Sequence, residues 1–278
     1  MELQSAIGFG IAGNMTGHLE QAGEASDFVQ VETAEARAPK GMFPFYVPHH
    51  QGQLVAFPLC SERLRLPLEE ARVQIEPEVA LRLALDWEGD AVVAVRPVAF
   101  AAYNDASIRR PAAKISEKKN WGPSTKGLSA AWIALDTLAP GGLLDRFRLA
   151  SFLLRDGVLH AYGEDSPVAG YSYFHEELLL WIADRLNHQQ DHGPLEDLAA
   201  HLSTARRPSE AIVAIGATRY TSFGTENFLQ PGDTALVVLY DGTRFDPAAV
   251  RARILAGQDL GDGLSVLRQR VTGAAALQ

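Results

Sequence analysis

Short apolar segments separated by turn residues recur along this chain, and they limit its fold class more than any other feature of the sequence. Each segment is a few residues long and partly alternates between apolar and polar side chains, which is the pattern of half-buried strands. We expect strands at residues 53–59, 79–85, 91–100, 131–135, 147–154, 211–215 and 234–240. Turn residues such as Glu88-Gly89-Asp90 separate these segments, and Asp156-Gly157 predicts a hairpin turn.

Three other segments have helical periodicity. The clearest covers residues 174–188, where Leu178 and Ile182 recur at the spacing of one helix face. Shorter helices are expected at 194–203 and 247–255. Because strands outnumber helices and do not alternate with them regularly, the order argues against repeated βαβ units and favours an α+β fold that is mostly β. At roughly 150 residues per domain, the 278 residues predict one large domain, alone or with a smaller partner.

Charge and composition exclude several classes of partner. The net charge of −9 predicts no binding to nucleic acid or to anionic membrane surfaces. The sequence contains no run of ~20 apolar residues, and its first residues lack the basic and apolar segments of a signal peptide. The single cysteine, Cys60, cannot form an internal disulfide, which favours a reducing compartment. We therefore expect a cytoplasmic protein.

A glycine pattern near the N-terminus has two interpretations. Residues 8–13 read GFGIAG, and Glu32 follows about 20 residues later, as in a dinucleotide-binding turn. However, residues 3–7 are too polar for a central parallel strand. The helix that should follow would also contain Gly17 and Gly23, each of which costs about 1 kcal/mol relative to alanine. A nicotinamide-dependent oxidoreductase is therefore the less favoured alternative, and a loop that serves another site is preferred.

Carboxylates recur at two places where strands are expected. Glu76 and Glu78 flank Pro77, and side chains at i and i+2 of a strand share one face. Two like charges on one face repel, and the pair is favourable when it is exposed to solvent or when it binds a cation. Asn104 and Asp105 directly follow an apolar segment. Three carboxylates would form an all-oxygen site, which selects Mg²⁺ first and then Mn²⁺ or Ca²⁺.

The order of several motifs resembles that of the fumarylacetoacetate hydrolase superfamily. The motifs are EPEVALRLAL, YNDASIRR, the lysine of GPSTKGL, DGVLHAYGEDSP and LQPGD, and together they span roughly residues 10–240. They are specific in combination and weak singly. The resemblance implies that a divalent metal, usually Mg²⁺, is bound by three ligands, which are Glu76, Glu78 and Asp105. It also implies an active-site lysine, Lys126, and substrate-binding residues, which are Arg109, Ser107 and Thr218.

The same resemblance gives residues 14–21 a role. NMTGHLEQ is similar to the superfamily motif Asn-Tyr-x-x-His-x-x-Glu, in which a His–Glu dyad on a lid activates water. His18 would be the general base, and its ordinary pKa near 6.5 suits proton transfer at neutral pH. The dyad glutamate is replaced by Gln21, and Glu20 or Glu24 would have to take its place.

Two further positions depart from the superfamily pattern. The lysine that follows the lid strand is Val47 here. The late Thr-Gly-Thr-Pro loop appears as Ile215-Gly216-Ala217-Thr218, so its hydroxyl is lost at Ala217 or has moved to Thr218. With Gln21, these changes favour an alternative in which the protein binds a small molecule without converting it. They affect the predicted reaction more than the predicted metal site.

By resemblance, the expected fold is a mixed, rolled β-sheet domain, similar to a β-sandwich or barrel, with a small N-terminal α+β part. We place that part, with the lid, at residues 1–60 and the catalytic domain at 61–278. The implied function is that of a metal-dependent hydrolase or lyase acting on a small dicarbonyl or oxo-acid. Carbon–carbon bond hydrolysis, decarboxylation and isomerisation through a metal-bound enolate all remain open. The resemblance also implies a homodimer.

Overall fold

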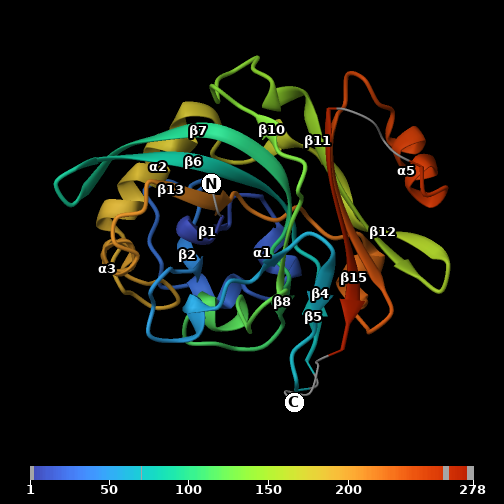
Figure 1. The fold of residues 1–278 in the computed structure, drawn as a ribbon, viewed down its shortest axis with the longest axis horizontal. Coiled ribbons are helices and arrows are strands. Elements are labelled where there is room, and N and C mark those ends of the chain that lie inside the picture. Colours follow the sequence, from blue (N-terminus) through green and yellow to red (C-terminus); the bar gives the residue numbers. More distant parts are fainter. Residues whose placement is uncertain (1–2, 70, 259–262, 274–278) are drawn as a thin grey trace.

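Two β-sheets form the framework of the molecule. The computed structural model describes residues 3–69, 71–258 and 263–273. The larger sheet has the order β2-β1-β13-β6-β7-β9-β3, with β10 paired to β7. Its strands are β1 (Ile7–Ala12), β2 (Gly41–Tyr46), β3 (Leu59–Cys60), β6 (Pro77–Glu88), β7 (Ala91–Asn104), β9 (Lys126–Leu128), β10 (Ile133–Ala134) and β13 (Glu210–Ala214). Figure 1 shows the long β6–β7 hairpin curving over the N-terminal strands.

The second sheet packs beside the first and has the order β12-β11-β14-β15-β4. Its strands are β4 (Arg63–Arg65), β11 (Phe147–Arg155), β12 (Val158–Pro167), β14 (Thr234–Asp241) and β15 (Leu264–Thr272). A separate two-stranded ladder joins β5 (Val73–Gln74) to β8 (Ser107–Ile108). This mostly β, strongly curved architecture confirms the predicted fold class. Strands from both sides of residue 60 share the larger sheet, and the domain boundary there stays a prediction.

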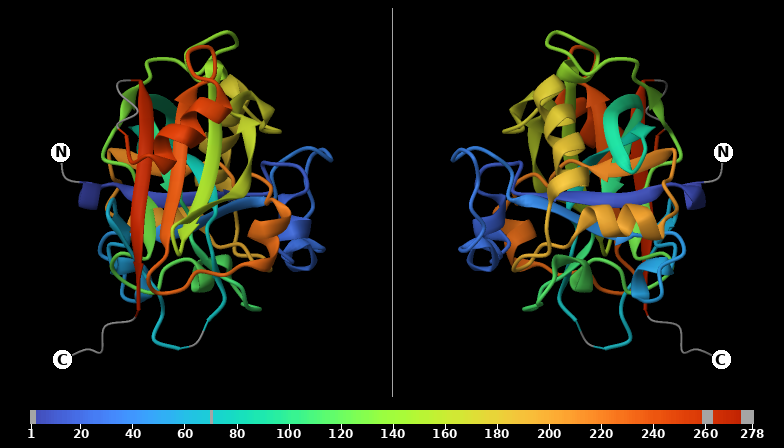
Figure 2. Two further views of the ribbon diagram at one scale, coloured as in Figure 1. Left: turned by 90° about the vertical axis from the view of Figure 1, so that its right-hand side faces the viewer. Right: turned by 90° about the vertical axis from the view of Figure 1, so that its left-hand side faces the viewer.

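Helices pack against different parts of the two sheets. They are α1 (His18–Gln21), α2 (His175–His188), α3 (Leu198–Thr204), α4 (Ser222–Glu226) and α5 (Pro247–Leu255). Short 3-10 turns lie at Leu3–Ser5, Ala25–Phe28, Gln53–Val55, Ile115–Lys118, Leu144–Arg146 and Val168–Gly170. Helix α2 buries Leu178, Ile182 and Leu186 in the main core, whereas α5 packs Val250 and Ile254 on the second sheet. Figure 2 shows α5 on the outer side of that sheet. Among the described residues, no helix is both long enough and apolar enough to cross a membrane.

Several elements follow directly from their local sequence. The predicted hairpin turn between β11 and β12 has Asp156 at φ 50° and Gly157 at φ 78°, which is the left-handed geometry of a two-residue turn. Asp246 accepts a hydrogen bond from the backbone of Ala248, and Pro247 opens α5, so this helix begins where predicted.

Several segments differ from the sequence prediction, among them the strands β1, β2 and β12, which were not among the predicted strands. Residues 53–59 are not a strand, because Gln53–Val55 form a 3-10 turn and only Leu59–Cys60 pair in the sheet. Pro58 has no backbone N–H to donate, and Leu54 is held by core packing instead of by a strand ladder. Strand β15 was not predicted, although its Leu267, Gln269 and Val271 alternate with exposed Arg268 and Arg270.

The glycine pattern in residues 8–13 has a packing role. Gly8 and Gly10 lie inside β1 and not in a turn, so the dinucleotide-binding interpretation of this segment is wrong. A Cβ atom at Gly10 would lie 2.3 Å from Cζ of Phe43, and one at Gly8 would lie 2.3 Å from Cε2 of Phe45. These glycines therefore leave the space that two buried phenyl rings of β2 occupy.

We expect a Gly10→Ala variant to lose about 1–3 kcal/mol of unfolding free energy, the usual cost of overpacking a core. The Phe43 ring is 2% exposed, and it would have to shift to make room for the added methyl group. Urea unfolding would measure the change. Gly170→Ala is the control, because the nearest atom to its added Cβ is 3.8 Å away. Equal stability of the Gly10→Ala variant and the wild type would contradict this account of β1.

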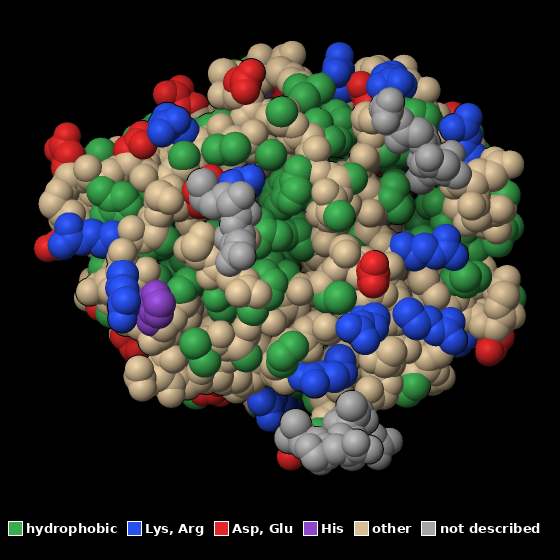
Figure 3. All heavy atoms as spheres, viewed as in Figure 1, with side chains coloured by type: hydrophobic (Ala, Val, Ile, Leu, Met, Phe, Trp, Pro, Cys, Tyr) green, Lys and Arg blue, Asp and Glu red, His purple; other side chains and the backbone are tan. Residues whose placement is uncertain are grey.

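Charge is unevenly distributed over the surface, although the net charge is negative. On the face drawn in Figure 3, Lys and Arg side chains gather on the lower part, and Asp and Glu side chains are more frequent near the upper left edge. Hydrophobic side chains are interspersed among them, as on most protein surfaces.

Candidate functional site

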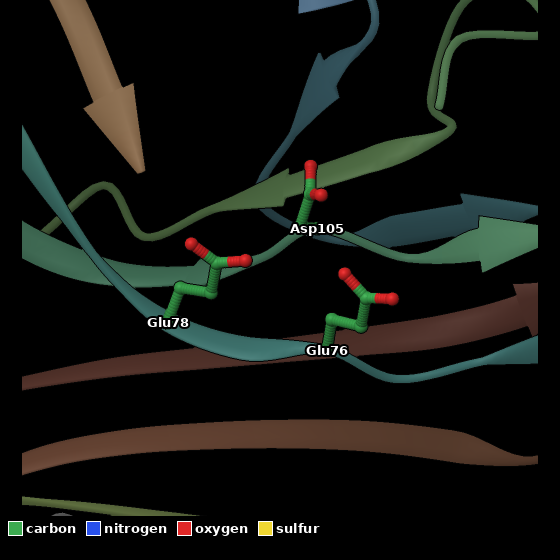
Figure 4. A group of neighbouring side chains, drawn as sticks. All are labelled: Glu76, Glu78 and Asp105. Carbon is green, nitrogen blue, oxygen red and sulfur yellow. The ribbon is translucent and has the colours of Figure 1, made fainter. Parts of the chain in front are cut away.

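Three buried carboxylates meet where β6 begins and β7 ends. Glu76 and Glu78 lie on the same face of the chain at the start of β6, and the β6–β7 register places Pro77 opposite Asn104. The backbone N–H of Asp105 donates to the carbonyl of Glu76 at 2.9 Å. One oxygen from each carboxylate lies within 4.8 Å of the others. Figure 4 shows Glu76 and Glu78 rising from one strand toward Asp105.

Asn104 and Gln269 hold the ends of these strands together. Oδ1 of Asn104 accepts from the backbone N–H of Glu76 at 3.1 Å, and its Nδ2 donates to Oε1 of Gln269 at 3.0 Å. Gln269 is fully buried and its Nε2 donates to the carbonyls of Cys60 and Arg63, both at 3.1 Å. Gln269 was not among the predicted site residues, because it lies on β15, which was not predicted.

Three buried cations surround the carboxylates. Nζ of Lys119 lies 2.6 Å from Oε2 of Glu76 and 2.5 Å from Oδ2 of Asp105. Nζ of Lys126 lies 3.0 Å from Oδ1 of Asp105 and donates to the carbonyls of Asp105 at 2.8 Å and Ala106 at 2.6 Å. Nη2 of Arg109 lies 2.6 Å from Oε1 of Glu76. Lys126 and Arg109 were predicted from the sequence, whereas Lys119 was not.

The pKa values of the two glutamates are shifted in opposite directions. Burial by itself would raise the pKa of Glu76, but Lys119 and Arg109 hold that pKa well below its ordinary value. Burial raises the pKa of Glu78 well above its ordinary value, and the charges of Asp105 and Glu76 add to the effect. Burial also lowers the pKa of Lys126 to about 8, against the attraction of Asp105.

His18 lies in the same pocket as Glu76 and Glu78. Helix α1 begins at His18 after Gly17, whose φ of 83° is a left-handed conformation. Nδ1 of His18 lies 2.9 Å from the carbonyl oxygen of Thr218. Because a carbonyl oxygen only accepts, Nδ1 carries the proton, and Nε2 of the neutral ring is left as the acceptor. Burial lowers the pKa of His18, so the neutral form is favoured.

The other predicted residues of the N-terminal motif lie in different surroundings. The side chain of Glu20 is exposed. Gln21 accepts from the backbone N–H of Tyr220 at 2.8 Å and donates to the Tyr220 carbonyl at 3.3 Å, so it ties α1 to residues 218–221. Glu24 lines the pocket and pairs with Arg109 at 2.7 Å. The structure therefore brings Glu24, and not Glu20, to the site.

The residues predicted to bind substrate contact protein groups. The Arg109 guanidinium reaches Glu24 and Glu76, and it also donates to Gln74 and to the Tyr220 hydroxyl, each at 2.6 Å. Ser107 donates to the carbonyl of Asp105 at 3.1 Å. The buried hydroxyl of Thr218 has no hydrogen-bond partner within the described chain.

The loop around residues 215–218 completes one side of the pocket. The backbone N–H of Gly216 donates to Oε2 of Glu78 at 2.7 Å, and Ala217 lines the pocket. Gly216 has φ 118°, a conformation that favours glycine. Val47, which stands where the resemblance predicts a lysine, is buried in the main core.

Comparison with solved structures gives matches across nearly the whole chain. The structure of Cg1458 with an inhibitor has 16% identity and a TM-score of 0.57, covering 97% of this chain and 77% of that one. The 5-carboxymethyl-2-hydroxymuconate delta-isomerase from Mycobacterium smegmatis has 12% identity and a TM-score of 0.53, covering 98% and 80%. A 2-keto-3-deoxyarabinonate dehydratase has 10% identity and a TM-score of 0.51, covering 97% and 74%.

These structural matches show that the chain shares the fold of these three proteins, and they confirm the fold that was expected from the motifs. A comparison with curated proteins by sequence gave no match. A family model described as a family of unknown function, DUF5718, matches residues 24–271. Because this match covers most of the sequence, the chain belongs to the DUF5718 family.

Proposed function

We propose that this protein is an enzyme that acts on a small oxo-acid or dicarbonyl compound and requires a divalent cation. One observation carries the proposal: three carboxylates, each at most 2% exposed, offer oxygens within 4.8 Å of one another, and two of them line the pocket that also contains His18. Carboxylates are rarely buried together unless a cation or a proton compensates their charge.

The donor set fits a hard cation. Glu76, Glu78 and Asp105 offer only oxygen ligands, which favours Mg²⁺ and then Mn²⁺ or Ca²⁺. Oε1 of Glu76 accepts no hydrogen bond of good geometry from the described residues, although Arg109 lies close to it. When bound, such a cation would polarise the adjacent oxygens of a dicarbonyl substrate as a Lewis acid.

His18 would act as the general base. Thr218 fixes the ring with Nδ1 protonated, so Nε2 is the atom that would take a proton from water or from a carbon next to the substrate carbonyl. Gln21 supports this arrangement indirectly, since it binds the backbone of Tyr220 two residues beyond Thr218. Lys126 would keep Asp105 in position, because its ammonium group bridges the carboxylate and two backbone carbonyls.

The isomerase and the dehydratase among the structural matches suggest proton transfer beside a carbonyl as the shared chemistry. Hydrolysis of a carbon–carbon bond and decarboxylation are the other reactions we propose to test. Gln21 favours a second candidate, a small-molecule binding protein, because an amide supplies no charge to stabilise a protonated His18. Conversion of a bound compound to product distinguishes the enzyme from the binding protein.

We expect turnover of at least one compound in a panel of acylpyruvates and oxaloacetate, measured by absorbance or chromatography with Mg²⁺ or Mn²⁺ present. Removal of the cation with EDTA should abolish the activity, and added Mg²⁺ should restore it. Uncatalysed decarboxylation of oxaloacetate by the free metal is the control. Saturable binding of these compounds without conversion would support the binding protein instead.

A further inference from the structure

Lys119 occupies the position between two of the three carboxylates. Its Nζ atom touches Glu76 and Asp105 at 2.6 and 2.5 Å, and the side chain is 3% exposed. No sequence motif gave this residue a role. Its neighbour Lys118 is also buried, but its ammonium group lies on Glu24 at 2.9 Å and on Asp27 at 3.1 Å.

We propose that Lys119 is a tethered counter-ion that competes with the divalent cation for Glu76 and Asp105. The inference rests on the cation site of the proposed function and adds a second state of that site, in which no cation is bound. Without a cation, the ammonium group neutralises the carboxylates and keeps the site folded. When a cation binds to Glu76 and Asp105, the Lys119 ammonium group has to move away from these two carboxylates.

The balance of charge supports competition. Asp105 contacts both Lys119 and Lys126, and Glu76 contacts both Lys119 and Arg109. Within the described chain, Glu78 has no ion pair, so all three cations contact the other two carboxylates, Glu76 and Asp105. A divalent ion added to this group would lie close to an ammonium group in a buried, weakly screened environment, where like charges repel strongly.

The side chain can move although its backbone is fixed. The N–H of Lys119 donates to the carbonyl of Ser116 at 3.1 Å, and the next residue, Asn120, donates to the carbonyls of Phe45 and Ala56 at 2.8 and 2.9 Å. Lys119 also lines the pocket, where its Nζ lies 4.9 Å from the centre of the Phe43 ring. Its flexible four-carbon stem lets the ammonium group turn toward the pocket without backbone movement.

The test is calorimetric titration of Mn²⁺ and Mg²⁺ into the wild type, Lys119→Met and Lys118→Met. If the wild type must first reach a cation-competent state populated at about 10% or less, Lys119→Met will bind Mn²⁺ about tenfold or more tightly. Lys118→Met is the matched control, because it removes the same charge one residue away, from carboxylates outside the triad. Its affinity for Mn²⁺ should stay close to that of the wild type.

Thermal unfolding gives a second readout. Without a cation, Lys119→Met should unfold at a lower temperature than the wild type, and Mn²⁺ should restore its stability while changing the wild type little. If Lys119→Met does not fold without a cation, Lys119→Gln and purification in Mn²⁺ allow the same comparison. Affinity of Lys119→Met equal to or below that of the wild type would overturn the inference, as would the absence of binding in every variant.

These results are separate from the oxo-acid panel. Tighter Mn²⁺ binding by Lys119→Met with no turnover of any compound would leave the competition intact and refute the proposed reaction. Turnover that depends on the cation, with equal affinities in both proteins, would refute the competition and leave the reaction intact.

Discussion

An Asp105→Asn variant is expected to lose measurable Mg²⁺ binding and about 3–5 kcal/mol of unfolding free energy, the usual cost of removing one partner of a buried ion pair. Asp105 is fully buried and is the shared partner of Lys119 and Lys126. Its replacement would leave both ammonium groups near a neutral amide, with Glu76 as the remaining carboxylate on Lys119. Urea unfolding and calorimetric titration of Mg²⁺ measure the two effects.

Asp191→Asn is the control for this experiment. Asp191 pairs with Lys114 at 2.7 Å, but its side chain is 65% exposed, and exposed pairs contribute about 0–1 kcal/mol. The two variants remove the same charge from different surroundings. If Asp105→Asn unfolds at the same urea concentration as the wild type, the carboxylate does not stabilise the buried cations as described.

His18→Asn should lower kcat by about 10²–10⁴ on any oxo-acid that the wild type converts, which is the usual contribution of a general base. Asparagine can still donate a hydrogen bond to the carbonyl of Thr218, but it offers no basic nitrogen. Mg²⁺ affinity should change little, because His18 is not one of the three proposed ligands. Rate measurements at saturating substrate, together with calorimetry, check both statements.

His188→Asn is the matched control, since the His188 side chain is 70% exposed and pairs with Asp184 on the surface of α2. It should leave kcat unchanged. An unaltered kcat in His18→Asn would remove His18 from the reaction and would leave the role of the base to another group in the pocket.

The carboxylate cluster could be predicted because local sequence fixes most of it. Glu76 and Glu78 share a face through strand geometry, and the β6–β7 hairpin, which turns at residues 88–90, brings Asp105 back to the start of β6. The register of a hairpin is set by residues that are close together in the sequence. The order of the motifs therefore predicts that Asp105 lies near Glu76 and Glu78. The approach of His18 depended on the resemblance, since no local pattern connects residue 18 with the carbonyl of residue 218.

Lys119 and Gln269 could not be placed in the same way. Two adjacent lysines at the end of a 3-10 turn have the composition of a solvated surface, and only tertiary packing shows that both are buried. Gln269 lies on a strand whose alternation was present in the sequence, but its partners are far away along the chain. The glycines of residues 8–13 show the opposite case, where a familiar spacing arises from ring packing between β1 and β2.

The hydrogen bonds of the Gln269 side chain have a consequence for folding during synthesis. This side chain bonds to the carbonyl of Cys60, 209 positions earlier, and through Asn104 it holds the backbone beside Glu76. Contacts of such long sequence separation form slowly, because a large loop must close first. A polypeptide still on the ribosome can therefore make all three acidic residues and yet lack their mature arrangement until position 269 has emerged.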